Sequence, residues 1–141
     1  MFSLIFFYKT PIQLACELEN EEIFKLIIND KRVLFGDGVF LNCISLKQIH
    51  IPSFITEIGK EAFSGCSSLV QIEIPNSVRK IGDFAFAKCC SLIKITVPSS
   101  VIEIGEKVFD GCTSLKEITI PCILKSFDQT GINEKALIKF I

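Results

Sequence analysis

The amino-acid sequence predicts an α/β repeat solenoid, a stack of short coils with a parallel β-sheet on one face and short helices on the other. Residues 35–126 divide into four blocks of 23 residues without an insertion or deletion, namely 35–57, 58–80, 81–103 and 104–126. Seven columns keep one residue type in all four blocks, and their first members are Gly36, Phe40, Cys43, Ser45, Leu46, Ile49 and Pro52. Self-similarity at a fixed period of this length is the signature of a repeat architecture.

One wall of each coil is expected to be a β-strand. In the second block, Ile72 and Ile74 alternate with polar residues, which is the period of a half-buried strand. Pro75 ends this strand because it has no N–H to give to a neighbour. Since the coils stack, the strands of successive blocks form a parallel sheet. Apolar residues return at Val78 and Ile81, which predicts a second short extended stretch before the Gly column.

The wall that follows is expected to be a short helix. Ile81, Ala85, Phe86 and Cys89 stand at i, i+4, i+5 and i+8, the spacing of one buried helical stripe. Acidic residues occupy the start of this helix in three blocks, where they would meet the positive end of the helix dipole. These residues are Asp37, Asp83 and Glu106. The residues before the four column cysteines are Asn42, Gly65, Lys88 and Gly111, and three of them are types that suit a left-handed C-terminal cap.

The blocks resemble the BspA-like class of leucine-rich repeats. The family pattern, I-G-x-x-A-F-x-x-C-x-x-L-x-x-I-x-I-P-x-S-V, is met in phase by all four blocks of residues 35–126. Departures are small: Gly38 and Val39 in the first block, Phe84 at an outward position in the third, and Cys122-Ile123 in the last. The resemblance implies a leucine-rich-repeat coil stack and points toward adhesion or surface-antigen roles in microbes.

Both ends of the chain depart from the repeat. Residues 10–34, with Thr10-Pro11 followed by a second apolar run, resemble a single ankyrin repeat, whose helix pair would have Leu14, Leu18, Ile23, Leu26 and Ile27 on its inner faces. We therefore expect residues 1–34 to form a helical, ankyrin-like N-terminal cap, because one such repeat cannot bury its own apolar face. Residues 127–141 are expected to form a C-terminal helical cap, with Asn133 capping a last helix through Ala136 and Phe140.

Charge and hydropathy argue against two kinds of partner. Fifteen basic and sixteen acidic residues give a net charge of −1, so no global field attracts nucleic acid or an anionic membrane. The apolar run 2–8 is far short of the roughly 20 residues that cross a bilayer, so no transmembrane segment is expected. No basic residue precedes this run, unlike in a secretory signal, and this favours a cytoplasmic location. The family resemblance favours the cell surface, and the sequence leaves the location open.

Seven cysteines raise the question of metal or redox chemistry. Four of them form one column and are expected to be small buried apolar side chains, with disulfides between neighbouring coils or metal binding as the alternatives. Cys90 and Cys122 are the thiols expected to be exposed. The sequence contains no Cys-x-x-Cys zinc motif and no glycine-rich phosphate motif, so we expect neither a metal nor a cofactor. His50, the only histidine, is expected to face solvent, which disfavours a catalytic Cys–His pair with either exposed thiol.

The outward positions of the stacked strands form the candidate partner-binding face. Its residues are Gln48, His50, Gln71, Glu73, Lys94, Thr96, Glu117 and Thr119. Adjacent strands are expected to place Lys94 beside Glu117 and His50 beside Glu73. The charges are mixed, so a partner of a single sign is not implied, and a plain solvated sheet face is the alternative.

The sequence thus favours a non-catalytic macromolecule-binding module that recognises a protein or a glycan through this face, with rim residues Ser53, Asn76 and Ser99. The resemblance implies a surface antigen or adhesion role. The first alternative is an intracellular ankyrin/leucine-rich-repeat adaptor or scaffold. The second is a cysteine-dependent enzyme. Self-association through uncapped solenoid ends is a further expectation, as it would be for a fragment of a longer array.

Overall fold

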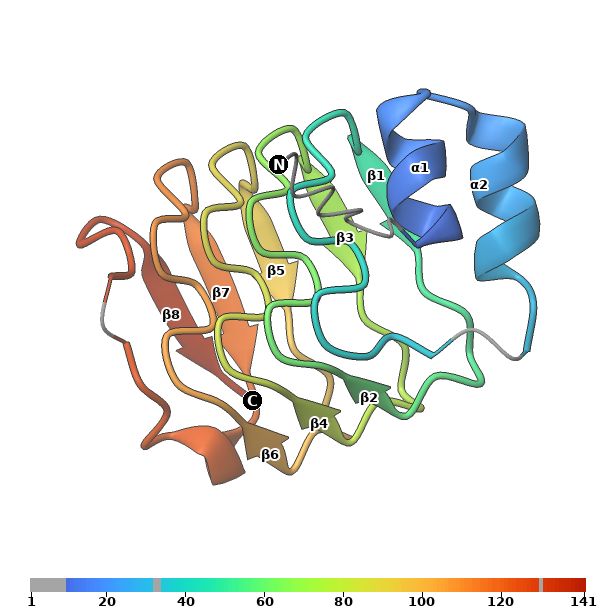
Figure 1. Cartoon of the computed structure of the whole chain (residues 1–141). Coiled ribbons are helices and arrows are strands. Elements are labelled where there is room, and N and C mark those ends of the chain that lie inside the picture. The colour runs from blue at the N-terminus through green and yellow to red at the C-terminus, as the bar shows by residue number, and fades with distance from the viewer. Residues whose placement is uncertain (1–9, 32–33, 130) are drawn as a thin grey trace, which may run out of the picture.

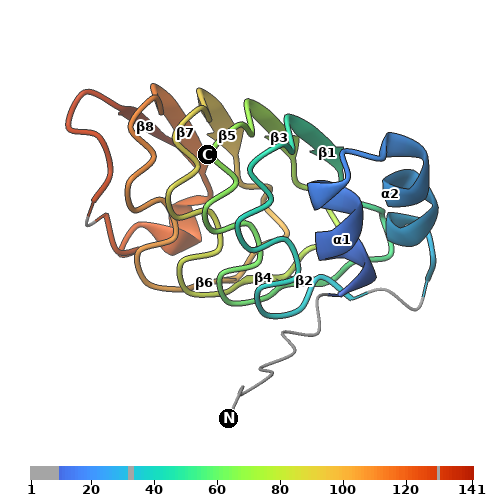
Figure 2. The ribbon, with the colours of Figure 1, turned by 45° about the horizontal axis from the view of Figure 1, so that its top comes forward.

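The protein is a single stack of coils with a helix pair at its N-terminal end (Figure 1). The structure is a computed structural model, and it describes residues 10–31, 34–129 and 131–141. The apolar run 2–8 lies outside the described residues. The expected solenoid is confirmed, and its two sheets lie on opposite sides of the stack with the apolar core between them (Figure 2).

The main sheet consists of one strand from each coil, and all its pairs are parallel. Its strands are β1 (Gln48–His50), β3 (Gln71–Glu73), β5 (Lys94–Thr96), β7 (Glu117–Ile120) and β8 (Leu137–Phe140). The pairs β1–β3, β5–β7 and β7–β8 are hydrogen-bonded ladders, and β3 lies beside β5. In the first two ladders, residues 23 apart pair, such as Ile49 with Ile72 and Ile95 with Ile118. The repeat period is thus one turn of the solenoid.

A second, smaller sheet lies on the opposite side of the stack. It consists of β2 (Glu57–Ile58), β4 (Lys80–Ile81) and β6 (Glu103–Ile104), paired in parallel in that order. Each strand has an acidic or basic residue outside and an isoleucine inside, and Ile58 and Ile81 are fully buried. This sheet confirms the second extended stretch that the apolar positions predicted.

The third wall of the coils is a ladder of turns, so the expectation of short helices there was wrong. An α-helix keeps its N–H groups bonded within itself, whereas here alternate N–H groups donate to the next coil. Phe40 N donates to Ala62 O and Phe63 N donates to Ala85 O, each at 2.8 Å. Two columns of the repeat also have positive φ, which interrupts a helix. The first column consists of Gly38, Glu61, Phe84 and Lys107, and the second of Asn42, Gly65, Lys88 and Gly111. The left-handed geometry before each cysteine is thus confirmed, in a turn instead of a helix cap.

Two of the three acidic residues expected on this wall, Asp37 and Asp83, bridge coils. Asp37 Oδ1 accepts a hydrogen bond from the backbone N of Lys60 at 2.8 Å, and Asp83 Oδ1 accepts one from the backbone N of Glu106 at 2.9 Å. No helix dipole is present at these positions, so the expected dipole interaction is replaced by a hydrogen bond to the next coil.

The core contains a column of stacked phenylalanine rings. The ring centroids of Phe40 and Phe63 lie 4.8 Å apart, those of Phe63 and Phe86 5.3 Å, and those of Phe86 and Phe109 6.0 Å, with nearly parallel planes. The four rings are at most 1% exposed. Aromatic pairs at such separations stabilise a core by about 0.5–1.5 kcal/mol beyond the burial of their area.

The invariant Gly column marks the closest approach of neighbouring coils. A Cβ at Gly82 would lie 2.6 Å from the backbone N of Lys60 and 2.8 Å from the carbonyl carbon of Gly59. At Gly36, which has no preceding coil, nothing lies within 4 Å of the same position. Glycine is therefore required because a side chain would push two coils apart.

The N-terminal cap is a pair of short helices, α1 (Pro11–Glu17) and α2 (Glu21–Ile28). Thr10 and Gln13 form a capping box at the start of α1, and Asn20 caps α2. The pair docks on the first coil, since the Ser45 hydroxyl donates to Cys16 O at 2.7 Å and the Phe24 ring lies 5.8 Å from that of Phe40.

The inner faces of this helix pair differ from the expected ones. The buried side chains are those of Ile12, Ala15, Cys16, Phe24 and Ile28. The expected inner residues Leu14, Leu18, Ile23 and Leu26 are instead 45–75% exposed, and Ile27 is half-buried. The reason is that the first coil, and not a neighbouring helix pair, provides the apolar surface on which the helices rest. The ankyrin-like character of the segment stays a prediction.

The C-terminal segment forms a fifth, shorter coil, and the expectation of a capping helix was wrong. After a 3₁₀ turn, η1 (Cys122–Leu124), the chain returns as β8, which pairs in parallel with β7. Ile118 pairs with Ile138, so this coil has 20 residues instead of 23. The last residue is also bonded to the end of β7, since Ile141 N donates to Ile120 O at 3.0 Å. The pairing with β8 satisfies the backbone N–H and C=O groups along the edge of β7. A helix lying outside the sheet would leave those groups of β7 unpaired.

Candidate partner-binding face

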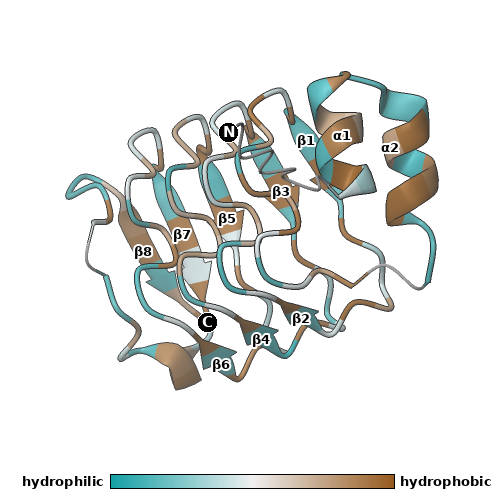
Figure 3. Cartoon of the chain, in the orientation of Figure 1, coloured by the Kyte–Doolittle hydropathy of each residue, from teal (hydrophilic) through white to brown (hydrophobic). Residues whose placement is uncertain are grey.

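The eight candidate residues lie together on the outer surface of the main sheet, which we call the outer sheet face. Their side chains alternate along the strands with the buried residues Ile49, Ile72, Ile95 and Ile118. Six are exposed, and Glu117 and Thr119 are half-buried. Figure 3 shows hydrophilic segments recurring on the neighbouring strands β1, β3 and β5. The strand period, in which alternate side chains face outward, thus produces a continuous polar surface.

The register brings the expected pairs side by side. His50 pairs with Glu73 and Gln48 with Gln71 on β1 and β3. Lys94 pairs with Glu117 on β5 and β7, where the Lys94 Nζ lies 2.6 Å from Glu117 Oε1. The expected placement of Lys94 beside Glu117 and of His50 beside Glu73 on adjacent strands is thus confirmed.

A third charged residue joins the C-terminal half of the outer sheet face. Lys139 on β8 places its Nζ 2.9 Å from Glu117 Oε2, so one carboxylate accepts from two ammonium groups. The ammonium groups of Lys94 and then Lys139 hold the pKa of Glu117 below its ordinary value. Lys139 was absent from the predicted face because residues 137–140 were assigned to a helix. The alternation of Ile138 and Phe140 with Lys139 was the signal that could have found it.

The N-terminal half of the outer sheet face borders a groove between the helix pair and the first two strands. The groove has a volume of about 940 Å³. Gln48, His50, Gln71 and Glu73 contribute to its lining. Opposite them lie residues of the helix pair, including Cys16, Phe24 and Lys25. No pattern in the sequence indicated this groove, because it depends on where the helices dock.

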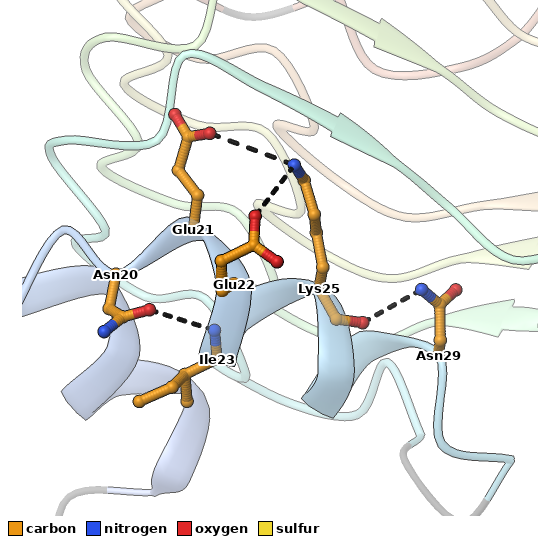
Figure 4. Close-up of polar contacts among 6 residues, drawn as sticks. All are labelled: Asn20, Glu21, Glu22, Ile23, Lys25 and Asn29. Carbon is orange, nitrogen blue, oxygen red and sulfur yellow. Dashed lines mark hydrogen bonds and ion pairs between the residues drawn. The ribbon is translucent and has the colours of Figure 1, made fainter.

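Helix α2 contributes Glu21, Phe24, Lys25 and Ile28 to the lining of this groove, and the polar contacts of the helix are drawn in Figure 4. Asn20 Oδ1 accepts from Ile23 N at 3.0 Å at its start, and Asn29 Nδ2 donates to Lys25 O at 2.9 Å at its end. The Nζ of Lys25 also lies 4.0 Å from Glu21 Oε2 and 3.8 Å from Glu22 Oε1. These exposed ion pairs stabilise the helix only slightly. Glu21 and Lys25 both line the groove, so this wall of the groove carries both charges.

The cysteines occupy the expected environments. The column residues Cys43, Cys66, Cys89 and Cys112 are buried, as is Cys16, whereas Cys90 and Cys122 are exposed, and all seven are free thiols. Cys90 lies near Lys88 O and Gly111 O in the third and fourth coils, whereas His50 lies on β1 in the first coil. Within residues 10–31, 34–129 and 131–141, no group of three or more His, Cys, Asp or Glu residues could hold a metal ion.

No helix in the described part of the chain is both long and apolar enough to cross a bilayer.

Comparison with known proteins agrees with the repeat architecture. Residues 20–141 match the model of a family described as "BspA type Leucine rich repeat region (6 copies)". The match extends beyond the four equal blocks at both ends, which agrees with the presence of a fifth coil. A search of curated proteins found no match.

Three solved structures are similar to this chain. A leucine-rich repeat protein from Bacteroides ovatus is 34% identical with a TM-score of 0.72, covering 77% of this chain and 28% of that protein. The leucine-rich repeat protein of T. pallidum is 32% identical with a TM-score of 0.59, covering 74% and 44%. A leucine-rich cell surface protein from Faecalibacterium prausnitzii is 26% identical with a TM-score of 0.65, covering 74% and 28%. The chain thus spans less than half the length of each of these proteins.

Proposed function

The chain belongs to the BspA type leucine-rich repeat family, and we propose that it is a non-catalytic module that binds a protein or a glycan through the outer sheet face. The observation that carries this proposal is the continuity of the face. Its polar side chains stand on the neighbouring strands β1, β3, β5 and β7 on one side of the stack, and at β1 and β3 they border a groove. Repeat solenoids commonly use an extended surface of this kind for recognition.

The chemistry of the outer sheet face suits a polar partner. Amide, imidazole, hydroxyl and carboxylate groups offer both donors and acceptors, and Glu117 pairs with two lysine side chains, those of Lys94 and Lys139. The hydroxyl groups of a glycan or the backbone of an extended peptide would satisfy such a mixture. The rim residues Ser53, Asn76 and Ser99 are exposed and extend the surface at the strand ends.

We extend the proposal to recognition at a cell surface, in an adhesion or antigen role. The support is the similarity to the Faecalibacterium prausnitzii cell surface protein. This part of the proposal concerns the setting in which binding occurs and is separate from the binding face itself.

Glycan arrays and a displayed peptide library, probed with the labelled chain, would test the proposal. A variant with Gln71→Ala and Glu73→Ala removes two side chains that line the groove. The matched control, Glu57→Ala with Glu103→Ala, removes two exposed side chains from the smaller sheet on the opposite side. We expect the face variant to lose at least about tenfold in affinity for any ligand found, as one or two buried polar contacts are worth about 1.5 kcal/mol or more.

The control variant is expected to bind as the unmodified chain does, and circular dichroism would verify that both variants fold. Binding that survives in the face variant but is lost in the control would show that the opposite sheet recognises the ligand, and it would overturn the proposal.

A further inference from the structure

The main sheet has an open edge on the side of the helix pair. Within residues 10–31, 34–129 and 131–141, β1 pairs with β3 and with no other strand. Figure 2 shows β1 as the last strand of the sheet, with α1 and α2 beyond it. The helix pair docks on the turns of the first coil, through Ser45 and Phe40. In the described part of the chain, the free edge of β1 therefore has no strand beside it.

The backbone groups on this open edge belong to Gln48 and His50. Successive residues of a strand point their N–H and C=O groups to alternate sides of the strand. Lys47 O, directly before β1, accepts from Val70 N in the second coil at 2.9 Å. By alternation, the groups of Ile49 also point toward the second coil. The N–H and C=O groups of Gln48 and His50 therefore point away from β3, toward the open edge.

The groove between the helix pair and the first two strands lies along this edge. All three residues of β1 contribute to its lining, as do residues of α2. Its volume of about 940 Å³ is within the range of pockets that hold a ligand. An open strand edge is a template for pairing with another chain. The groove thus provides space next to a strand edge that can pair.

The lining of the groove is apolar toward the core and charged elsewhere. Phe24 packs against Phe40 of the core, with 5.8 Å between the ring centroids, and Ile28 is also buried. Ile44 lines the groove as well and is 64% exposed. The charged residues of the lining are three carboxylates and two ammonium groups, those of Glu19, Glu21, Glu73, Lys25 and Lys47. This lining suits a chain with apolar side chains on one face and polar or basic side chains on the other.

We propose that the groove binds an extended peptide, which adds to β1 as a further parallel strand. Side chains alternate between the two faces of a strand, so the apolar ones contact Phe24 and Ile44 and the polar ones extend the outer sheet face. The backbone of the peptide pairs with Gln48 and His50. This inference rests on the proposed function, and it selects a polypeptide over a glycan because the open edge offers donors and acceptors at the spacing of a strand.

A synthetic peptide with the sequence of residues 91–100, SLIKITVPSS, is the probe. It carries the required alternation, with Ile95 and Val97 on one face and Lys94 and Thr96 on the other. The lysine also complements the excess of carboxylates in the groove. The full chain, labelled with ¹⁵N, is titrated with this peptide, and the backbone amide resonances of Gln48 and His50 are followed. We expect both resonances to shift and to saturate.

Two N-methylated forms of the peptide separate backbone pairing from side-chain contact. In the protein, Val97 N donates to Thr119 O of the following coil at 2.8 Å, so a parallel strand of this sequence uses the N–H groups of Ile95 and Val97. Methyl groups on these two nitrogens should weaken binding at least about tenfold, because two hydrogen bonds are lost. Methyl groups on the nitrogens of Lys94 and Thr96 point away from β1 and should have a much smaller effect. The two peptides have the same side chains, so each is the control for the other.

A pair of variants at His50 tests the same contact from the side of the protein. His50→Pro removes the N–H on the open edge, where proline is tolerated because that group does not bond to β3. His50→Ala removes the same side chain and keeps the N–H. We expect the proline variant to bind the peptide at least about fivefold more weakly than the alanine variant. The methylated peptides decide the matter with the unmodified chain if the proline variant fails to fold.

The proposal is overturned if the peptide shifts neither resonance, or if both methylated peptides bind equally well or equally poorly. It is also overturned if the two resonances shift with the concentration of the chain alone, which would assign the open edge to a second copy. Loss confined to methylation at Lys94 and Thr96 would overturn the parallel direction. If these tests fail while a ligand from the arrays is lost in the Gln71→Ala, Glu73→Ala variant, the proposed function stands without this inference.

Discussion

Substitution of alanine in the Gly column should have opposite effects at two positions of the same repeat. Neither Gly36 nor Gly82 has a positive φ, so alanine is compatible with the backbone at both. Replacing glycine by alanine reduces the conformational freedom of the unfolded chain, and this effect taken alone should stabilise either variant by about 0.4–1 kcal/mol. At Gly36 nothing lies within 4 Å of the new Cβ. We therefore expect Gly36→Ala to be neutral or slightly stabilising.

At Gly82 the new Cβ would lie 2.6 Å from the backbone N of Lys60 and 2.8 Å from the carbonyl carbon of Gly59. Ordinary contact requires about 3.5 Å, so the two coils must separate by about 1 Å at this point. The obstacle is backbone and cannot rotate away. The hydrogen bond from Gly82 N to Ile58 O, now 2.8 Å, would also lengthen. Overpacking of this kind, with a weakened hydrogen bond, should lower the free energy of unfolding by about 3 kcal/mol.

Urea unfolding followed by far-ultraviolet circular dichroism would compare the two variants with the unmodified chain. Hydrogen exchange would show whether the loss in Gly82→Ala centres on the second and third coils. Equal stability of Gly36→Ala and Gly82→Ala would refute the explanation of the Gly column by close approach of the coils.

Three further predictions follow from the core, a turn and the ion pairs. Phe63→Ala should lower the free energy of unfolding, measured in urea, by about 3–5 kcal/mol, because it leaves a cavity in the middle of the ring column. The control Phe54→Ala, at a 38% exposed site, should lower it much less. Similar losses in the two variants would contradict a stabilising role of the stacked rings. Lys88→Gly should raise the melting temperature by relieving a φ of 57°, a gain of about 1 kcal/mol at most, and no gain would indicate an unstrained turn. Lys139→Ala should raise the pKa of Glu117 toward its ordinary value, as an NMR titration would show. Because the pKa of Glu117 is lowered in the folded protein, its ion pairs stabilise the protein above the unfolded pKa of about 4.5, and this stabilisation is lost as pH falls through the folded pKa. An unchanged titration of Glu117 would contradict the pairing with Lys139.

The repeat period predicted the parts of the fold that depend on stacking. Residues 23 apart must become neighbours once the blocks are coils, so the partners of Ile49 and Lys94 followed directly from the sequence. The buried state of the Phe and Cys columns followed in the same way. For the same reason the residues of the outer sheet face could be assigned before the structure was known, although their role in binding stays a proposal.

The errors arose where the spacing of apolar residues fits two structures. Ile81, Ala85 and Phe86 suit a helical stripe, but Phe84 with positive φ and the hydrogen bonds to the next coil make a series of turns. At the C-terminus the last coil is three residues shorter, so Ile138 fell out of the expected register. The groove could not be found at all, because it depends on the docking of α2 and not on any local pattern.

The hydrogen bonds between turns have a consequence for how the chain can change in length. In this ladder of turns, the second and third coils make the same set of backbone hydrogen bonds to the coils on either side. Loss or duplication of one whole unit, such as residues 58–80, therefore joins surfaces that already fit each other. A change of another size within these equal coils would place residues of different columns opposite each other. Evolution of this molecule should accordingly proceed in steps of whole units, with the outer sheet face gaining or losing one strand at a time.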